Sequence, residues 1–256
     1  MIGVGVIGAT GRVGAEVCRA VYAAGDLELA GGISQSKVGA EASEALGLEG
    51  SDLVLAGELK AFEEAGVEVA VDFTKGEYAP EHVEWAIEHG VHIVVGTTGF
   101  EVDEAWRDAP VGIVVAPNFA IGAVLMQRFA REAARHLPAV EIVELHHDGK
   151  ADAPSGTAAA TADAVAAART EAWEGPADES LSGVRGGERA GIRIHSIRLP
   201  GLVAHQEVIM GGHGQTLTIR HDSTDRTSFV PGVLLAIRWA PSHPGLTEGL
   251  APILEG

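Results

Sequence analysis

The segment 144–157 holds the side chains best suited to chemistry on an anionic substrate. It reads Glu-Leu-His-His-Asp-Gly-Lys-Ala-Asp-Ala-Pro-Ser-Gly-Thr, so two adjacent histidines stand close to a lysine. A histidine beside a positive charge can give or take a proton near neutral pH. Lysines are scarce in this chain, and the charge of Lys150 suggests a substrate with more than one carboxylate.

The same segment predicts the start of a helix that could hold a carboxylate. Ser155 is a suitable N-cap for the alanine-rich stretch that follows it. The backbone amides of Gly156 and Thr157 would then point outward from the helix N-terminus, where partial positive charge favours anions. We expect Ser155, Gly156 and Thr157 to contribute to a substrate site.

Two other interpretations of these histidines stay open at this point. They could be structural, or His146, His147 and Asp148 could ligate a metal ion. The metal interpretation ranks below catalysis because the sequence shows no second cluster of ligands. We therefore predict no metal site.

A glycine-rich turn near the N-terminus predicts a dinucleotide site. The apolar run 4–7 leads into a turn and then a helical pattern; the turn comprises Gly8, Ala9, Thr10, Gly11, Arg12, Val13 and Gly14. This order lets the backbone approach a pyrophosphate at a helix N-terminus. The glycine spacing differs from the strict motif, and an ordinary tight turn is the competing interpretation. The position at the start of an alternating α/β half favours the nucleotide.

The end of the second predicted strand bears on which nucleotide is bound. It continues as Ile33-Ser34-Gln35-Ser36-Lys37, without the carboxylate that commonly holds the ribose hydroxyls of NADH. Ser34, Lys37 and the nearby Arg12 suit the 2′-phosphate of NADPH instead. We predict that NADPH is preferred or at least accepted, with NADH as the other cofactor. A solvated loop is the alternative interpretation of these residues.

Small and hydroxyl residues follow three further predicted strands. The strand ends are Asp72-Phe73-Thr74, Gly96-Thr97-Thr98-Gly99-Phe100 and Ala116-Pro117-Asn118-Phe119. In a parallel sheet these ends meet at one edge, where ligands bind. The residues that we expect to line the nicotinamide side of the cofactor are Thr74, Gly96, Thr97, Thr98, Ala116, Pro117, Asn118 and Phe119.

The first half of the chain alternates strand-like and helical patterns, as in a doubly wound α/β domain. The predicted strands are 3–7, 27–33, 67–73, 91–95 and 111–115, and the predicted helices are 11–24, 77–88 and 102–107. This order favours a parallel sheet of the Rossmann type.

After Pro117 the pattern changes to that of an α+β domain. A helix is expected before Pro138, with an apolar face formed by Ile121, Leu125, Phe129 and Ala133. A second helix is expected over 157–172. A third, over 232–239, is expected to return to the first domain.

The strands expected in this second domain are 140–145, 192–199, 205–210 and 216–221. Their alternation suits an antiparallel or mixed sheet with one exposed face, which is a candidate subunit interface. Residues 175–191 are interpreted as an irregular surface loop because they are rich in glycine and serine.

Composition limits the class of protein. The 256 residues carry a formal net charge of -18 at pH 7, which opposes binding to nucleic acid or to anionic membranes. No apolar stretch is long enough to cross a bilayer, and the single Cys18 cannot form an internal disulfide. The first residues lack the basic segment of a secretory signal. We expect a cytoplasmic globular protein of two domains.

The ordered motifs resemble the signature of the dihydrodipicolinate reductase family. The block His-His-x-x-Lys followed by Asp-Ala-Pro-Ser-Gly-Thr-Ala, at 146–158, carries the likeness most specifically. The likeness extends through residues 8–14, 72–74, 96–100, 116–122 and 221–232, and so covers nearly the whole chain.

This resemblance implies an NAD(P)H-dependent reductase of a cyclic imine dicarboxylate in the lysine and diaminopimelate pathway. Hydride would pass from the nicotinamide to the ring, and protonation would yield tetrahydrodipicolinate. By position, His146 would be the proton donor and acceptor and Lys150 a second proton donor. His147, Gly156 and Thr157 would hold the substrate carboxylate. The sheet of the second domain would build a homotetramer.

The expected domains are a dinucleotide-binding domain over 1–118, to which 232–256 return, and a substrate-binding and tetramerisation domain over 119–231. Because cofactor and substrate would bind to different domains, we expect closure about hinges near 118–122 and 228–232, helped by Arg226.

Besides a metal-dependent hydrolase built on His146, His147 and Asp148, which ranks lowest, two other classes of protein stay open. One is a different Rossmann dehydrogenase, such as an amino-acid dehydrogenase, which would share the nucleotide half only. The other is an NAD(P)-sensing regulator without enzymatic activity. The residues from His146 to Thr157 argue against the regulator, which would need neither an acid nor a carboxylate site.

Overall fold

The computed structural model describes every residue except Ala177, and the chain divides into two compact units. One unit comprises Met1–Ile121 and Arg226–Gly256, and the other comprises Gly122–Asp225. Within the described residues, no helix combines the length and the apolar character needed to span a membrane.

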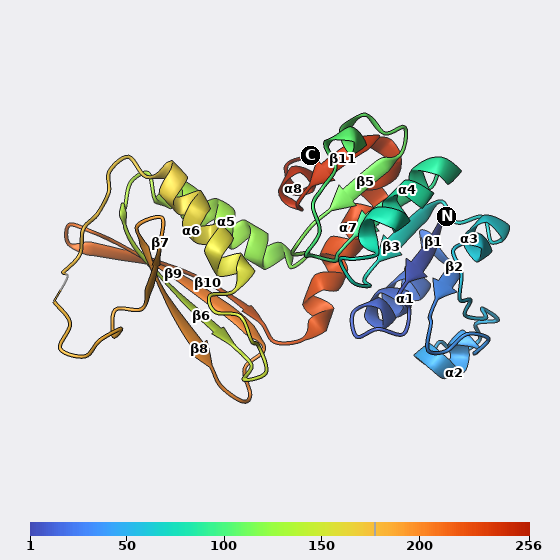
Figure 1. Ribbon diagram of the computed structural model, residues 1–256, viewed down its shortest axis with the longest axis horizontal. Coiled ribbons are helices and arrows are strands. Elements are labelled where there is room, and N and C mark those ends of the chain that lie inside the picture. Colours follow the sequence, from blue (N-terminus) through green and yellow to red (C-terminus); the bar gives the residue numbers. More distant parts are fainter. Residues whose placement is uncertain (177) are drawn as a thin grey trace. The chain divides into compact units, whose positions relative to one another are not determined.

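The first unit is built on a six-stranded parallel sheet with the order β11-β5-β4-β3-β1-β2 (Figure 1). The strands are β1 (Ile2–Ile7), β2 (Leu27–Ile33), β3 (Val69–Asp72), β4 (His92–Val95), β5 (Gly112–Val115) and β11 (Gly245–Glu248). This sheet confirms the predicted parallel α/β fold. Strand order reverses between β1 and β3, and ligands of open α/β sheets bind beyond the carboxyl ends of the strands at such a point.

Helices cover the sheet on both faces. From the β1–β3 boundary the chain adds strands in both directions. Because each crossover is right-handed, the helices of the two directions lie on opposite faces. Helices α1 (Gly14–Ala23) and α7 (Val230–Trp239) pack against each other. Helices α3 (Lys60–Glu64) and α4 (Ala79–His89) meet through the rings of Phe62 and Trp85, whose centroids lie 6.1 Å apart. The Phe62 ring occupies the space over Gly5 and Gly31, so strands β1 and β2 need glycine there.

Two helices of this unit differ from their predicted bounds. Helix α1 begins at Gly14 and not at Gly11, because the Gly11 amide donates to the Gly8 carbonyl and closes a turn. Residues Glu104–Asp108 form a short 3-10 helix in place of the predicted helix 102–107, and the Asp103 side chain caps it by accepting from the Ala105 amide. The elements that were not predicted are α2 (Ala42–Leu46), α3, β11, α8 (Ala251–Glu255) and the 3-10 helices Arg226–Phe229 and Ala240–Ser242.

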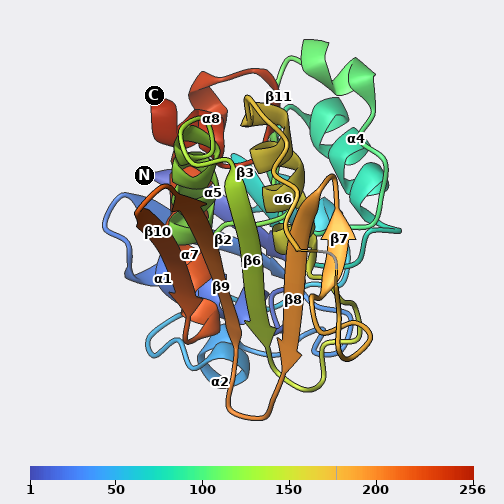
Figure 2. The same ribbon diagram turned by 90° about the vertical axis from the view of Figure 1, so that its left-hand side faces the viewer.

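The second unit contains a five-stranded sheet with the order β10-β9-β6-β8-β7 (Figure 2). The strands are β6 (Ala139–His146), β7 (Gly187–Arg189), β8 (Ile192–Arg198), β9 (Ala204–Gly212) and β10 (Gln215–Ser223). Strands β6 and β8 are parallel and the other pairs are antiparallel, so the predicted mixed sheet is confirmed.

Two helices cover one face of this sheet. Side chains of α5 (Ile121–Ala133) and α6 (Gly156–Ala168) share one core with Ile142 of β6 and Met210 of β9. Along β6 the side chains of Val140, Ile142 and Glu144 are buried, and the residues between them are half-exposed. Because side chains alternate along a strand, Glu144 and His146 lie in the same row as the core residues of β6.

Three predictions for the second unit are corrected by the structure. Helix α5 does not bury the face of Ile121, Leu125, Phe129 and Ala133: the buried positions are Ala123, Met126 and Ala130, and Phe129 is 53% exposed. The alanines let the helix approach the sheet closely, which the larger side chains would prevent.

Helix α6 ends at Ala168 and not at 172. Arg169 is extended, with ψ 139°, and its guanidinium donates to the carbonyl oxygens of Pro138 and Ala190. The predicted loop 175–191 contains the short strand β7, which pairs with β8; Ala177 of this segment lies outside the described residues.

Candidate active site

The turn after β1 depends on two glycines. Gly8 has φ +82°, and a Cβ atom there would lie 3.1 Å from the Phe73 carbonyl oxygen in the loop after β3. A Cβ atom on Gly14 would lie 2.2 Å from the Gly8 carbonyl oxygen, so α1 packs on the turn only because residue 14 has no side chain. The turn therefore presents bare backbone at a helix N-terminus, an arrangement suited to a pyrophosphate.

A cavity of about 570 Å³ lies at the β1–β3 boundary, beside this turn. Its lining residues follow β1, β3 and β4, and are Arg12, Val13, Phe73, Thr74, Lys75, Gly76, Gly96, Thr97 and Thr98. The buried Oγ1 atom of Thr97 has no hydrogen-bond partner among the residues that the structure describes. An unpaired hydroxyl in the wall of a cavity with two basic side chains, Arg12 and Lys75, fits a polar anionic ligand such as a dinucleotide.

Asp72 shapes the loop after β3. Its side chain is fully buried, and Oδ1 accepts from the Thr74 amide at 2.7 Å and from the Thr74 hydroxyl at 2.6 Å. Oδ2 lies 2.7 Å from Nδ1 of His82 on α4. The Asp72 carboxylate thereby fixes Thr74 at the cavity. Asp72 lies in a strand end that was expected to line the cofactor site, whereas His82 had not been predicted as a site residue.

The other predicted cofactor residues lie outside the lining of this cavity. Ser34 is 3% exposed, and its Oγ atom lies 2.6 Å from Oγ1 of Thr10, which links the end of β2 to the glycine turn. Lys37 is exposed farther along the same loop. In the segment 116–119, the Phe119 ring is buried and meets the Phe73 ring edge to face at 5.9 Å.

The second unit places a buried carboxylate at the centre of the predicted substrate residues. The Glu144 side chain has no exposed surface, and its Oε2 atom lies 2.5 Å from Nδ1 of His146. Its Oε1 atom accepts from the Ser155 amide at 3.3 Å. Arg198 donates to both oxygens, at 2.9 and 2.8 Å. Glu144 therefore connects a candidate proton donor to the start of α6.

These contacts set the charge of the Glu144–His146 pair. Burial raises the pKa of Glu144, but hydrogen bonds from Arg198, Ser196 and His146 outweigh burial and leave that pKa below its ordinary value. Burial lowers the pKa of His146, Glu144 opposes this effect, and the charges of Lys150 and Arg198 add to it. Glu144 is therefore ionised near neutral pH, and the His146 imidazole loses its proton at a lower pH than an ordinary histidine does.

The remaining predicted substrate residues surround this pair. Lys150 binds the Asp152 carboxylate, with Nζ at 2.7 and 3.0 Å from the two oxygens. His147 is exposed. The Ser155 hydroxyl caps α6 by accepting from the Ala158 amide at 3.1 Å, as expected for an N-cap. The next two residues, 156 and 157, begin the helix, where partial positive charge favours a carboxylate.

Glu144 and Arg198 are members of this cluster that were not predicted as site residues. Glu144 could have been found, because it stands two residues before His146 on a strand and so shares its face. No spacing in the sequence relates Arg198 to His146 in this way. Arg198 reaches the cluster because parallel pairing of β6 with β8 sets it opposite His146.

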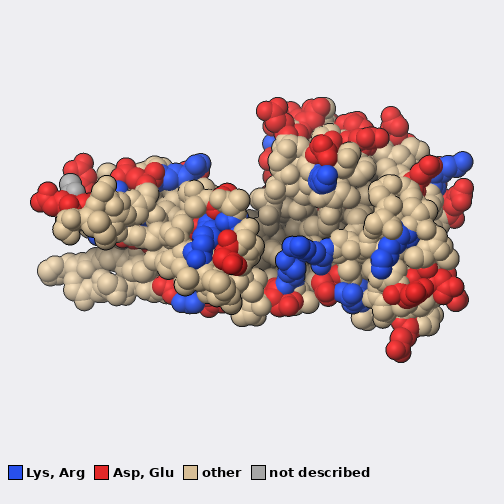
Figure 3. Space-filling view, turned by 60° about the horizontal axis from the view of Figure 1, so that its bottom comes forward, with Lys and Arg blue, Asp and Glu red and all other residues tan. Residues whose placement is uncertain are grey.

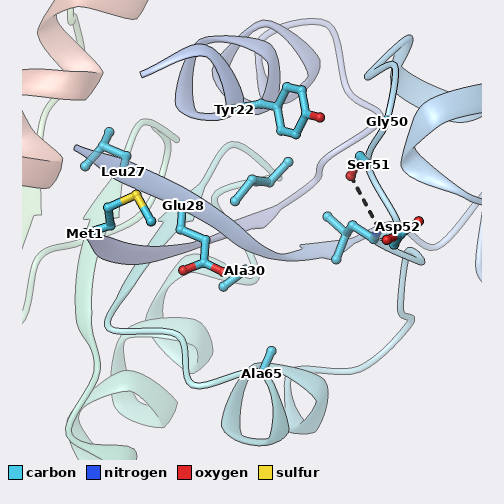
Figure 4. A pocket seen from close by; sticks show the side chains of 11 residues that line it. Met1, Tyr22, Leu27, Glu28, Ala30, Gly50, Ser51, Asp52 and Ala65 are labelled. Atoms are coloured by element: carbon cyan, nitrogen blue, oxygen red, sulfur yellow. Dashed lines mark hydrogen bonds between the residues drawn. The ribbon is translucent and has the colours of Figure 1, made fainter. Parts of the chain in front are cut away.

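A second hollow in the first unit, of about 530 Å³, lies beside β2 (Figure 4). Two carboxylates, Glu28 and Asp52, stand in its lining, and the residues described there include no lysine or arginine. This charge would repel an anionic nucleotide. On the face of the molecule drawn in Figure 3, basic side chains occur in separate small groups among acidic ones, as expected for a net charge of -18.

Comparison with known families places both halves of the chain. Residues 2–119 match the model of the dihydrodipicolinate reductase N-terminus, and residues 122–254 match that of its C-terminus. The chain belongs to the dihydrodipicolinate reductase family. It is similar to the 4-hydroxy-tetrahydrodipicolinate reductases of Nocardia farcinica, at 48% identity over 99% of both chains, and of Mycolicibacterium smegmatis, at 49% identity over 98% of both.

One solved structure agrees with this membership of the dihydrodipicolinate reductase family. The dipicolinate-bound dihydrodipicolinate reductase from Paenisporosarcina sp. TG-14 is 39% identical over 99% of both chains, with a TM-score of 0.88. A probable dehydrogenase from Thermotoga maritima is 13% identical with a TM-score of 0.63, which shows likeness of fold alone.

Proposed function

We propose that the chain is a 4-hydroxy-tetrahydrodipicolinate reductase, which uses a reduced nicotinamide nucleotide to form tetrahydrodipicolinate for lysine and diaminopimelate synthesis. One observation carries the assignment of the chemistry: the buried Glu144 carboxylate binds both the His146 imidazole and the Ser155 amide. A proton donor and a helix N-terminus able to hold a carboxylate are thus joined by one group. Family membership and full-length similarity to reductases of this name support the substrate.

The residues of the second unit have distinct roles in this reaction. A nicotinamide, when bound, supplies the hydride for the substrate ring. His146 gives the proton that completes the reduction, and Lys150 offsets developing negative charge and acts as a second donor. His147, Ser155, Gly156 and Thr157 hold the substrate carboxylate, since an imidazole and helix N-terminal groups suit an anion.

The cofactor is held by the first unit. The backbone of Gly8, Ala9, Thr10, Gly11, Arg12 and Val13 takes the pyrophosphate, and the loops after β3, β4 and β5 take the nicotinamide half. Ser34 and Lys37 suit a 2′-phosphate, so NADPH is preferred or at least accepted. Steady-state kinetics with both nucleotides test this preference, and a strong preference for NADH would contradict it.

The two halves of the reaction belong to two domains, 1–118 with 232–256 for the cofactor and 119–231 for the substrate. Hydride transfer then requires closure about hinges near 118–122 and 228–232, with Arg226 helping to hold the closed state. The exposed face of the second sheet, with Val143 and Ile209 among charged residues, is the surface for a homotetramer. A cytoplasmic location fits a biosynthetic enzyme with one buried, unpaired cysteine, Cys18.

The experiment is NADPH oxidation with freshly generated 4-hydroxy-tetrahydrodipicolinate. The parent protein should turn over this substrate, with product identified by mass spectrometry. Amino acids with oxidised nucleotide serve as the comparison, because an amino-acid dehydrogenase would turn these over instead. Activity with amino acids alone, or nucleotide binding without turnover of any substrate, would overturn the assignment.

A further inference from the structure

Arg198 stands at the end of β8 and contacts both arms of the proposed proton-transfer site. Its guanidinium donates to the two Glu144 oxygens at 2.9 and 2.8 Å and to the Asp152 carbonyl oxygen at 2.7 Å. Glu144 holds His146 through Nδ1, and the Asp152 carboxylate holds Lys150 through Nζ. One side chain thus connects the two groups to which the proposed function assigns proton transfer.

We infer that Arg198 is a positioning residue that holds His146 and Lys150 in a single arrangement for protonation of the substrate. This inference rests on the proposed function and adds to it a residue outside the segment 144–157. Arg198 acts through Glu144 and Asp152, and it has no role in the chemical step itself.

The chemistry of the guanidinium explains why arginine is needed here. Its planar fork binds both oxygens of one carboxylate, and a remaining N–H reaches a third acceptor. A lysine ammonium is a point charge on a flexible stem, so it cannot hold Glu144 and the Asp152 carbonyl in fixed directions at once. The parallel register, which sets Arg198 opposite His146, brings the fork to the correct end of β6.

Burial of the Arg198–Glu144 pair also favours a positioning role over a stabilising one. The side chain of Glu144 has no exposed surface and that of Arg198 is 19% exposed. Taking two charges out of water costs about as much as their attraction returns, so a buried pair is weak evidence for stability. The pair instead fixes the orientation of the Glu144 carboxylate, which also accepts from the Ser155 amide at the start of α6.

The chain offers a matched control in Arg189 of β7. Its Nε and Nη2 atoms bind the two oxygens of Asp163 at 2.9 and 2.7 Å, the same forked contact. That pair is exposed, at 52% and 49%, and among the described residues the side chain of Arg189 has its hydrogen bonds and ion pair with Asp163. Arg189→Lys therefore removes the same kind of two-oxygen contact between arginine and a carboxylate without changing the proposed active site.

The first experiment compares Arg198→Lys, Arg198→Gln and Arg189→Lys in the full-length protein. Both Arg198 variants should lose about 10- to 100-fold in kcat, because small misplacements of catalytic groups have costs of that size. The dissociation constant for NADPH, measured by fluorescence, should stay unchanged, and Arg189→Lys should match the parent. An Arg198→Lys variant with the parent's kcat would overturn the inference.

A pH profile separates positioning from general structural support. The charged groups that act on the His146 imidazole are Glu144, Lys150 and Arg198. Arg198→Lys keeps the positive charge, so the falling limb of the pH profile of kcat/KM should lie at the same pH as in the parent. Arg198→Gln removes a charge that disfavours the imidazolium, so that limb should move to higher pH. Equal profiles for both variants would contradict positioning through Glu144 and His146.

Two further variants keep the inference testable if substitutions at Arg198 fail to fold. Asp152→Ala changes a side chain that is 60% exposed, and it should lower kcat about tenfold by releasing Lys150. In a protein that already carries His146→Ala and Lys150→Ala, Arg198→Lys should cost little more, because it acts through those residues. An equally large loss in both backgrounds would refute the inference.

Assay of the parent protein distinguishes failure of the inference about Arg198 from failure of the proposed function. A parent that does not reduce 4-hydroxy-tetrahydrodipicolinate refutes the proposed function and, with it, the inference. A parent that does so while the Arg198 variants match it refutes the inference alone.

Discussion

The Nδ1 atom of His146 lies 2.5 Å from Oε2 of Glu144, a carboxylate whose side chain has no exposed surface. A neutral imidazole in this contact carries its proton on Nδ1, and an imidazolium carries protons on both nitrogens. Only Nε2 is then left to face a substrate. The contact therefore determines which nitrogen of His146 can transfer a proton.

The pH dependence of catalysis should follow His146. Burial holds the pKa of its imidazole below the ordinary value of 6.5, so the protonated donor is lost as the pH rises through a value below 6.5. We expect kcat/KM, which reports the free enzyme, to fall with rising pH in that range. A bound dianion should raise the pKa, so the limb in kcat should lie at higher pH.

Initial rates between about pH 5 and pH 8 in the parent and in His146→Gln test this expectation. The kcat of the variant should fall about 100-fold or more, and its kcat/KM should not show the decrease with rising pH. A limb that persists in His146→Gln would show that another group titrates.

Thr97→Val should separate cofactor binding from stability. The Thr97 hydroxyl is buried without a partner among the described residues, and an unpaired buried hydroxyl costs about 1–3 kcal/mol. Valine has nearly the same shape, so the melting temperature should be equal or higher. The dissociation constant for NADPH should rise about tenfold through loss of one hydrogen bond to the ligand.

Thr161→Val is the matched control for that substitution. The Thr161 hydroxyl donates to the Thr157 carbonyl at 2.7 Å and accepts from Gln127 and Gln206 at 3.1 and 2.9 Å. This variant should lose about 1–3 kcal/mol of unfolding free energy. Its affinity for NADPH should not change. If Thr97→Val is as unstable as Thr161→Val and binds NADPH normally, the hydroxyl has a structural partner.

Gly14→Ala should damage the glycine turn. The new Cβ atom would lie 2.2 Å from the Gly8 carbonyl oxygen, so α1 and the turn must separate. Overpacking of this kind costs about 1–3 kcal/mol, and the displaced amides should weaken NADPH binding. Titration of intrinsic fluorescence measures the affinity. Gly25→Ala, where a Cβ atom would meet nothing within 4 Å, should bind NADPH as the parent does.

Lys37→Ala should change the choice of nucleotide. If Lys37 binds the 2′-phosphate, its loss removes a charge-assisted hydrogen bond of about 1.5–3 kcal/mol, so KM for NADPH should rise roughly 10- to 100-fold. KM for NADH should stay unchanged, because NADH has no 2′-phosphate. Lys60→Ala, on α3, is the control for loss of one positive charge. Parallel changes with both nucleotides would contradict the assigned contact.

The amino-acid sequence by itself determined the parallel sheet, the nucleotide turn and the segment that carries His146 and Lys150. These features are local along the chain. Side-chain periodicity identifies a strand or helix, and a glycine after a strand marks a turn without reference to distant residues. The family resemblance rested on the same local motifs.

Only the tertiary structure decided which distant side chains complete the site. Arg198 lies 54 positions from Glu144 and meets it because β8 pairs with β6 in one particular register. The buried face of α5 and the end of α6 were likewise set by packing against the sheet and by the carbonyl contacts of Arg169. Strand register and close packing arise from interactions between segments, so the pattern within any one segment does not contain them.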